Sequence, residues 1–253
     1  MKPNLKISKF QDLIWQFYAE KKRTLPWREE ISLYGVFVSE VMLQQTQVAR
    51  VLSKYPEFLK MFPDFHALET AQLSDILRVW QGMGYNRRGK YLHESAKIIV
   101  SEYGGLLPQD PKILVTLPGI GKATASSISC FAYNRPEVFI ETNIRRVILH
   151  HFFADSTDVP DAEVLKVVAK VLDHDRPRDW YYALMDYGSE LAKVGENANK
   201  RSKHYARQSR FEGSDRQLRG QFLKLHLSGE VVVPKDKREK EILKALQKEG
   251  LIK

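Results

Sequence analysis

Hydrophobic residues recur mostly three and four positions apart along this chain, which is the spacing of an amphipathic helix, and strand-like alternation is scarce. Proline and glycine residues separate the helical segments, and Thr46 is placed to cap the third of them. The pattern predicts an all-α fold. The expected helices cover residues 5–20, 34–43, 47–60, 73–81, 87–103, 110–116, 122–133, 143–153, 162–172, 180–191, 217–227 and 239–249.

The last 60 residues differ in character from the rest. Residues 192–214 are polar and basic, and the last two predicted helices flank a short apolar run at 231–234. This arrangement indicates a small basic C-terminal element over 214–253, which we expect to resemble a reduced winged helix.

Composition narrows the class of protein. With 253 residues, 43% of them hydrophobic and 11% aromatic, the chain can bury a sizeable core, which excludes bulk disorder. No apolar stretch approaches the roughly 20 residues of a membrane span, and the N-terminus lacks a secretory pattern. A single cysteine, Cys130, excludes internal disulfides and any metal site built on several thiolates. We expect a cytoplasmic protein without a membrane partner.

The positive charge is concentrated near the C-terminus. Residues 200–253 carry 15 basic and seven acidic side chains, a net charge of +8, whereas residues 1–199 have a net charge of only +1. A basic segment of this kind suits a polyanion, because each neutralised phosphate releases condensed counterions. A solvated surface or a mobile tail accounts for the charge equally well. Charge alone therefore suggests a nucleic-acid partner but does not establish one.

A glycine-containing turn lies between two predicted helices, with the sequence Leu117-Pro118-Gly119-Ile120-Gly121-Lys122. Two glycines let the backbone turn tightly and approach another chain closely. The helix that begins near Lys122 offers free N–H groups and a positive dipole end, which together can hold a phosphate. An ordinary helix–helix turn is the alternative, but the flanking Pro118 and Lys122 favour a helix-hairpin-helix that binds the DNA backbone.

A carboxylate stands twenty residues past the second hairpin glycine. Glu141 follows the apolar run 138–140 and precedes a predicted helix. Taken alone, this is more typical of a residue that pairs with the helix dipole than of a catalytic group.

The hairpin and the downstream carboxylate together resemble the core of the helix-hairpin-helix DNA glycosylase superfamily. The chain is most similar to the branch of MutY-type adenine glycosylases. That similarity rests on four further segments: Leu25-Pro26-Trp27-Arg28, Ser39-Glu40-Val41-Met42-Leu43-Gln44-Gln45-Thr46-Gln47-Val48, Trp80-Gln81-Gly82-Met83-Gly84-Tyr85 and Ala183-Leu184-Met185-Asp186-Tyr187-Gly188.

The resemblance implies a two-lobed helical glycosylase fold. One lobe is expected to be the contiguous span 34–150, with the helix-hairpin-helix at about 113–127. The other is expected to combine 1–33 with 151–213, as a counterpart of the family's iron–sulfur lobe. The segment 214–253 is expected to form a separate, small basic element.

The resemblance also implies the chemistry, which is removal of a flipped base by hydrolysis. Glu40 matches the acid that protonates the leaving base, and its apolar helix favours the protonated form. Glu141 matches the carboxylate that stabilises the cationic sugar, although the family has Asp there, and Asn143 is expected to orient it or the water. Bifunctional relatives have a Schiff-base lysine where this chain has Ala123, so we expect no strand cleavage.

The residues expected to contact DNA or the flipped base are also assigned from the resemblance. Gln45 is the wedge that fills the gap, Thr46 contacts the opposite base, Tyr85 stacks beside the opened step, and Leu43 lines the base pocket. The others assigned to DNA or base binding are Gln44, Arg88, Leu117, Gly119, Gly121, Lys122, Ala123, Lys200, Arg201 and Lys203.

Two family features are missing. The family carries four cysteines that hold an iron–sulfur cluster, whereas residues 189–214 contain none, so we expect no cofactor and no metal. Lys200, Arg201 and Lys203 are candidates to replace the phosphate contacts of the cluster loop. About 40 C-terminal residues are also too few for the family's domain that reads 8-oxoguanine.

The expected function is therefore that of a monomeric, monofunctional DNA glycosylase in base excision repair. Its partner would be double-stranded DNA with a mispaired base, adenine opposite guanine or 8-oxoguanine. One alternative is a thymine or uracil glycosylase acting opposite guanine, which the missing C-terminal domain favours. Another is a catalytically inactive DNA-binding protein of the same fold, which the replacement of Asp by Glu141 favours.

Overall fold

The computed structural model describes residues 7–195, 197–206 and 210–252. These residues form α-helices and one short 3-10 helix, and their only strand-like pairing is an isolated bridge between Val159 and Ser202. The predicted all-α class is confirmed. None of the described helices is long and apolar enough to cross a lipid bilayer.

The chain divides into two compact units, each built from two separate stretches of sequence. Unit 1 comprises 1–29 and 122–207, and unit 2 comprises 30–121 and 208–253. The helices of unit 1 are α1 (Ile7–Lys21), α2 (Pro26–Glu29), α9 (Lys122–Tyr133), α10 (Thr142–Phe152), α11 (Asp161–Val171), α12 (Pro177–Val194) and the 3-10 helix η1 (Ala198–Arg201). Those of unit 2 are α3 (Leu33–Leu43), α4 (Val48–Met61), α5 (Phe65–Thr70), α6 (Leu73–Trp80), α7 (Arg87–Tyr103), α8 (Pro111–Leu114), α13 (Asp215–Leu227) and α14 (Lys237–Lys248).

These units differ from the lobes expected from the resemblance. Residues 122–150 belong to unit 1 rather than to a contiguous lobe over 34–150, and residues 208–253 belong to unit 2. The physical reason is that α10 packs against α12, α11 and η1, whereas the C-terminal helices pack on α6.

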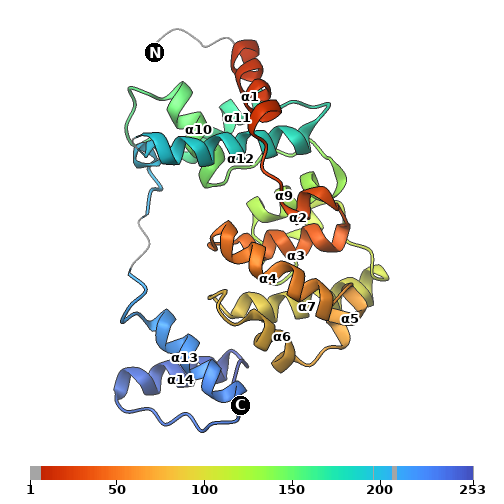
Figure 1. Cartoon of the computed structure of the whole chain (residues 1–253), viewed down its shortest axis with the longest axis vertical. Helices are drawn as coiled ribbons and strands as arrows, with labels where there is room; N and C mark the ends of the chain where they lie inside the picture. Colours follow the sequence, from red (N-terminus) through yellow and green to blue (C-terminus); the bar gives the residue numbers. More distant parts are fainter. Residues whose placement is uncertain (1–6, 196, 207–209, 253) are drawn as a thin grey trace. The chain divides into compact units, whose positions relative to one another are not determined.

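In unit 1, α12 packs against α1 and α10 (Figure 1). Trp180 and Tyr181 of α12 are fully buried. Further along α12, the Asp186 carboxylate is 3% exposed and accepts from Arg23 Nε at 2.6 Å and Arg28 NH1 at 2.9 Å. Arg28 also lies over the ring of Tyr182, 4.2 Å from its centroid. The segments 25–28 and 183–188, which carry part of the resemblance, therefore bind each other.

In unit 2, eight of the eleven residues of α3 are buried. Ser32 caps it, because the Ser32 hydroxyl accepts from Gly35 N at 2.9 Å. The short helix α5 was not predicted. It begins at a good capping signal, since the Asp64 carboxylate accepts from Ala67 N at 2.8 Å, but six residues are too few to show a helical period.

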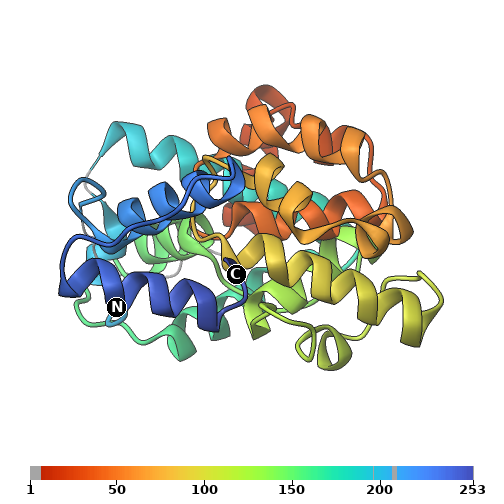
Figure 2. The same ribbon diagram turned by 90° about the horizontal axis from the view of Figure 1, so that it is seen from below.

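The C-terminal element is a pair of helices, α13 and α14, which lie side by side in both views (Figures 1 and 2). Residues 231–234 form no strand in the structure described, so the expected winged helix is not found. The pair packs on Leu77 of α6 through a cluster formed by Phe222, Leu223, Ile242, Leu246, Leu251 and Ile252.

Candidate active site

Glu141 caps α10 with its own side chain. Its Oε1 accepts from Asn143 N at 2.7 Å and from Ile144 N at 2.8 Å, and its Oε2 lies 3.3 Å from the donor Asn143 Nδ2. These bonds satisfy donors that the first turn of a helix leaves open, and the positive end of the helix dipole favours the negative charge. The additional methylene of Glu141, compared with Asp, is accommodated in this cap.

The environment of this carboxylate disfavours its charge overall. Burial raises the pKa of Glu141, while the bonds from Ile144 N and Asn143 N and the positive charges of Arg146 and Arg145 lower it. A poorly solvated carboxylate interacts strongly with a positive charge that develops beside it. A positive charge that developed beside Glu141 would therefore be stabilised strongly.

Gly188 of α12 allows α10 to approach closely at the same point. A Cβ at Gly188 would lie 2.5 Å from Asn143 O and 2.8 Å from Asn143 Cβ, so no larger residue fits without a shift. Arg146 NH1 donates to Asn143 Oδ1 at 2.7 Å and to Gly188 O at 2.8 Å. The predicted partner of Glu141, Asn143, is therefore held on one side by Arg146 and on the other by the backbone of α12.

We expect Gly188→Ala to displace the start of α10 and with it Glu141. The overlap should lower the free energy of unfolding by about 1–3 kcal/mol. Base excision should fall by about 100-fold, because a displacement near 1 Å at a reacting group has that effect. Urea unfolding and single-turnover kinetics measure the two quantities. Gly195→Ala is the matched control, since a Cβ there meets nothing within 4 Å, and equal excision by both variants would refute the expectation.

Glu40 lies in the last turn of α3 in unit 2. It is partly exposed, whereas its neighbours Ser39 and Val41 are buried. The backbone that carries Glu40 is therefore held between buried residues. Leu43, one turn further along, is also partly exposed.

Two loops of unit 2 carry the predicted wedge and stacking residues. Gln45 has a backbone φ of 54° and Tyr85 a φ of 47°, in the left-handed region that residues other than glycine rarely adopt. Such strain persists only where the surroundings impose it, and it is common at ligand-binding sites. Gln44 Nε2 donates to Gly119 O at 3.2 Å, so the first loop also contacts the hairpin turn.

Arg88 of α7 holds both loops. It is 6% exposed, and its NH1 donates to Val41 O at 2.9 Å and Met42 O at 2.8 Å. Its NH2 lies 2.8 Å from Thr46 Oγ1 and within 3.2 Å of two carbonyls in the second loop, Met83 O and Gly84 O. Burial lowers the pKa of Arg88 to about 10. Arg88 therefore faces protein acceptors rather than solvent, and it positions the loops predicted to contact DNA.

Thr46 consequently has a different local role from the one predicted. The N-cap of α4 is Gln47, which makes no side-chain capping bond. The Thr46 hydroxyl accepts from Arg88 and lies 3.3 Å from Gln44 O, to which it donates. Thr46 is thus committed to the loop rather than to the helix that follows.

We expect Arg88→Met to destabilise the protein by at least about 3 kcal/mol, because several buried carbonyls would lose their donor. DNA affinity should fall as the loops relax. The adjacent Arg87→Met is the control, since Arg87 is exposed and its nearest acidic partner, Glu249, is 4.0 Å away. That control should stay within about 0.5 kcal/mol of wild type in urea unfolding. Similar losses in both variants would show that Arg88 has no special role.

The predicted hairpin turn is formed. Gly119 has a φ of 75°, and a Cβ there would lie 2.6 Å from Tyr91 Cδ2, so the position requires glycine. Leu117 is buried and anchors the turn, while Gly121, Lys122 and Ala123 are exposed. The helix α9 begins at Lys122. The start of α9 therefore presents backbone and one basic side chain to solvent, as an anion-binding helix start does.

The sequence profile of the HhH-GPD superfamily of base excision DNA repair proteins matches residues 38–172. This match covers more than half of the chain. The chain belongs to the HhH-GPD superfamily.

Curated relatives carry a more specific name. The chain is 34% identical to an adenine DNA glycosylase of Mycolicibacterium smegmatis over 236 residues, which cover 87% of this chain and 80% of the relative. It is 40% identical to an adenine DNA glycosylase of Mycobacterium tuberculosis over 184 residues, or 71% of this chain. The matched region spans 60% of the length of that relative.

Solved structures agree on the fold. A thermostable thymine-DNA glycosylase superposes with a TM-score of 0.66 at 22% identity, covering 76% of this chain and 90% of that one. Endonuclease III trapped as a covalent intermediate with DNA superposes with a TM-score of 0.65 at 18% identity, covering 78% and 91%. At this level of identity the HhH-GPD fold is what the superpositions share.

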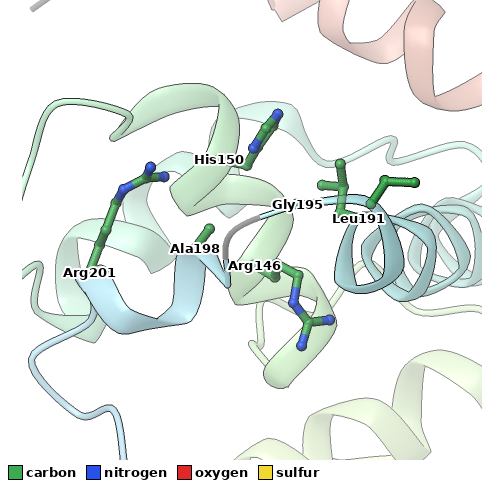
Figure 3. A pocket seen from close by; sticks show the side chains of 7 residues that line it. Arg146, His150, Leu191, Gly195, Ala198 and Arg201 are labelled. Atoms are coloured by element: carbon green, nitrogen blue, oxygen red, sulfur yellow. The ribbon is translucent and has the colours of Figure 1, made fainter.

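The three basic residues that were expected to replace the cluster loop lie on or beside η1. Lys200 and Lys203 are exposed, and Arg201 is partly exposed. The backbone of this segment is fixed, because Val159 N donates to Arg201 O at 2.8 Å and Lys203 N donates to Val159 O at 3.0 Å. Arg201 also lines a pocket of about 230 Å³ in unit 1 together with Arg146 and His150 of α10 (Figure 3). The segment is therefore a rigid basic surface.

The structure groups the predicted residues within each unit. Unit 2 holds Glu40, the two loops and the hairpin turn; unit 1 holds Glu141, Asn143, the start of α9 and the basic segment after α12. Among the residues described, no group of three or more His, Cys, Asp or Glu side chains could hold a metal ion.

Sequence reasoning missed three supporting residues: Arg146, Gly188 and the ion-paired Asp186. The segment 183–188 was recognised, but nothing in the sequence indicated that it would contact Asn143 and Arg28.

Proposed function

We infer that this protein is a DNA glycosylase that hydrolyses the N-glycosidic bond of a mispaired adenine in double-stranded DNA. The observation that carries the inference is the Glu141 cap, in which oriented donors hold a poorly solvated carboxylate at the start of α10. Membership of a base excision repair superfamily and similarity to adenine DNA glycosylases support the same activity.

The proposed reaction assigns one role to each carboxyl group. The glycosidic bond between the base nitrogen and C1′ breaks, and its electron pair stays with the base. Glu40 supplies a proton to a ring nitrogen of that base, which leaves as neutral adenine. The Glu141 carboxylate stabilises the positive charge on the sugar until a water oxygen bonds to C1′. That water gives up a proton to the solvent, from which Glu40 takes up a proton again. The product is an abasic site.

Ala123, the residue after Lys122, is the basis for proposing hydrolysis without strand cleavage. A lyase reaction needs an amine that can form a Schiff base with C1′, and position 123 is Ala. Lys122 begins α9, where its charge suits a phosphate. The predicted product is thus an intact strand that alkali cleaves.

A panel of duplexes tests this function. Single-turnover assays at low salt would use A:8-oxoguanine, A:G, T:G and U:G pairs, with and without alkali. We expect adenine release that needs alkali for strand scission. Release from T:G or U:G alone would show that the protein excises thymine or uracil and not adenine. Tight binding without release from any duplex would overturn the proposed enzyme and leave a DNA-binding protein.

A further inference from the structure

The two strained loops of unit 2 form one side of a pocket of about 830 Å³. Residues Gln45 to Gln47 line it from the first loop and residues Gln81 to Asn86 from the second, while α13 lines the other side. This volume lies in the range of small-ligand and nucleotide sites. The C-terminal helices thus contribute to the same surface as the predicted wedge and stacking residues.

Arg216 of α13 connects the two sides of the pocket. Its NH1 donates to Tyr85 Oη at 3.0 Å, and its guanidinium lies 5.6 Å from the centroid of the Tyr85 ring. Glu249, at the end of α14, accepts from Lys90 and Arg219 and so fixes the helix pair to α7. The position of α13 relative to Tyr85 is therefore determined by specific contacts.

One face of α13 is polar and faces this pocket. Arg216, Gln217, Gly220, Gln221 and Lys224 line it and are three or four positions apart, which places them on one side of a helix. The apolar face of the same helix packs through Phe222 and Leu223 on Leu77. Burial of the apolar face thus orients the polar face toward the loops.

Gly220 is unexpected in the interior of this helix. A helix with glycine in its interior is less stable than the same helix with alanine. A Cβ at position 220 would meet nothing within 4 Å. No contact inside the protein therefore requires glycine at this position. The space that Gly220 leaves open is instead part of the pocket, where it allows a bound group to approach the helix backbone closely.

The chemistry of the lining indicates the kind of group. All the charged side chains around the pocket are basic, namely Arg50, Arg216 and Lys224, and side-chain amides surround them. Arginine and lysine bind the O6 and N7 acceptors of guanine, and a glutamine amide can donate and accept on a purine edge. A purine with an acceptor edge therefore fits this lining better than a pyrimidine does.

We propose that α13 completes a site for the base opposite the excised one, a guanine-type purine read by the polar face that includes Gly220 and Gln221. This proposal rests on the proposed function, because only a DNA-binding repair enzyme meets such a base. Gly220 supplies the space, and Gln221 supplies hydrogen bonds. The short helix pair would then contribute directly to selection of the opposite base.

The test uses the full chain and duplexes with a tetrahydrofuran abasic analogue, which contains no excisable base. The nucleotide opposite the analogue is G, 8-oxoguanine, C or T, and the equilibrium Kd is measured for each. Wild type should prefer the purines. Gly220→Ala and Gln221→Ala should reduce that preference by about 5- to 10-fold, a typical effect of one lost base contact, and leave Kd for the pyrimidine duplexes unchanged. Gln247→Ala, an exposed glutamine of α14, is the matched control.

Folding and function are separated by the same variants. Gly220→Ala should melt at or above the wild-type temperature, because alanine favours the helix. Equal purine preference in wild type and Gly220→Ala would overturn the proposal. A uniform loss of affinity for all four duplexes, with a smaller salt dependence, would also overturn it, since the pocket would then bind a phosphate. If excision occurs but the opposite base has no effect, the proposed function stands and this inference fails.

Discussion

Replacing Glu40 by glutamine should reduce base excision by about 10²- to 10⁴-fold, the usual contribution of a general acid. Glutamine keeps the size of the side chain and one acceptor oxygen but has no acidic proton to give to the leaving base. Since Glu40 is partly exposed in the last turn of α3, the change should leave the fold intact. Single-turnover excision from an A:8-oxoguanine duplex measures the effect.

The control for this variant is another glutamate of unit 2. Glu102 is exposed near the end of α7, so Glu102→Gln changes the net charge equally without touching the α3 segment. Both variants should bind duplex DNA with similar affinity. An unchanged excision rate in Glu40→Gln would remove Glu40 from the proposed reaction.

The second large effect is expected for Glu141→Gln, which should lower the excision rate by about 10²- to 10³-fold. The amide oxygen of glutamine can still accept from Asn143 N and Ile144 N, so the cap should largely survive and stability should fall by no more than about 1 kcal/mol. The negative charge that stabilises the sugar is lost. Urea unfolding measured beside excision separates the two contributions.

Glu141→Asp is the charge-preserving control. It restores the residue of the resembling family, and aspartate is a good N-cap, so its excision rate should exceed that of Glu141→Gln by at least about tenfold. The pH dependence gives a further test. Because burial raises the pKa of Glu141, the wild-type rate should fall on the acidic side at a higher pH than an ordinary glutamate would give, as the carboxylate becomes protonated. Equal rates in the Gln and Asp variants would contradict a role for the charge.

Much of the fold could be predicted because helical periodicity is a local signal. The helical spacing indicated α4, α7, α9 and α12 to within a few residues, and the two glycines of 119–121 indicated the hairpin turn. Glu141 was recognised as a helix partner from its place before α10, and its capping bonds follow from that place. Each of these inferences depends on neighbours in sequence.

Interactions between distant segments could not be predicted in the same way. Arg88 reads as one of several basic residues at the start of a helix, yet burial and carbonyls in the last turn of α3, more than 40 positions earlier, give it its role. The close approach of Gly188 to Asn143 likewise depends on the packing of α12 against α10. The C-terminal pair was expected to stand apart, and its apolar cluster with Leu77 is visible only in three dimensions.

The most direct test of the proposed hydrolysis is to measure free adenine and covalent adduct in one reaction. Wild-type protein would be incubated in single-turnover excess with an A:8-oxoguanine duplex in the presence of borohydride, and the released base would be separated by chromatography. Hydrolysis by Glu40 and Glu141 predicts free adenine and no trapped protein–DNA adduct, and, in a parallel reaction without borohydride, a strand that alkali cleaves. A trapped adduct, or an intact adenine-containing strand with the protein bound to it, would contradict the account.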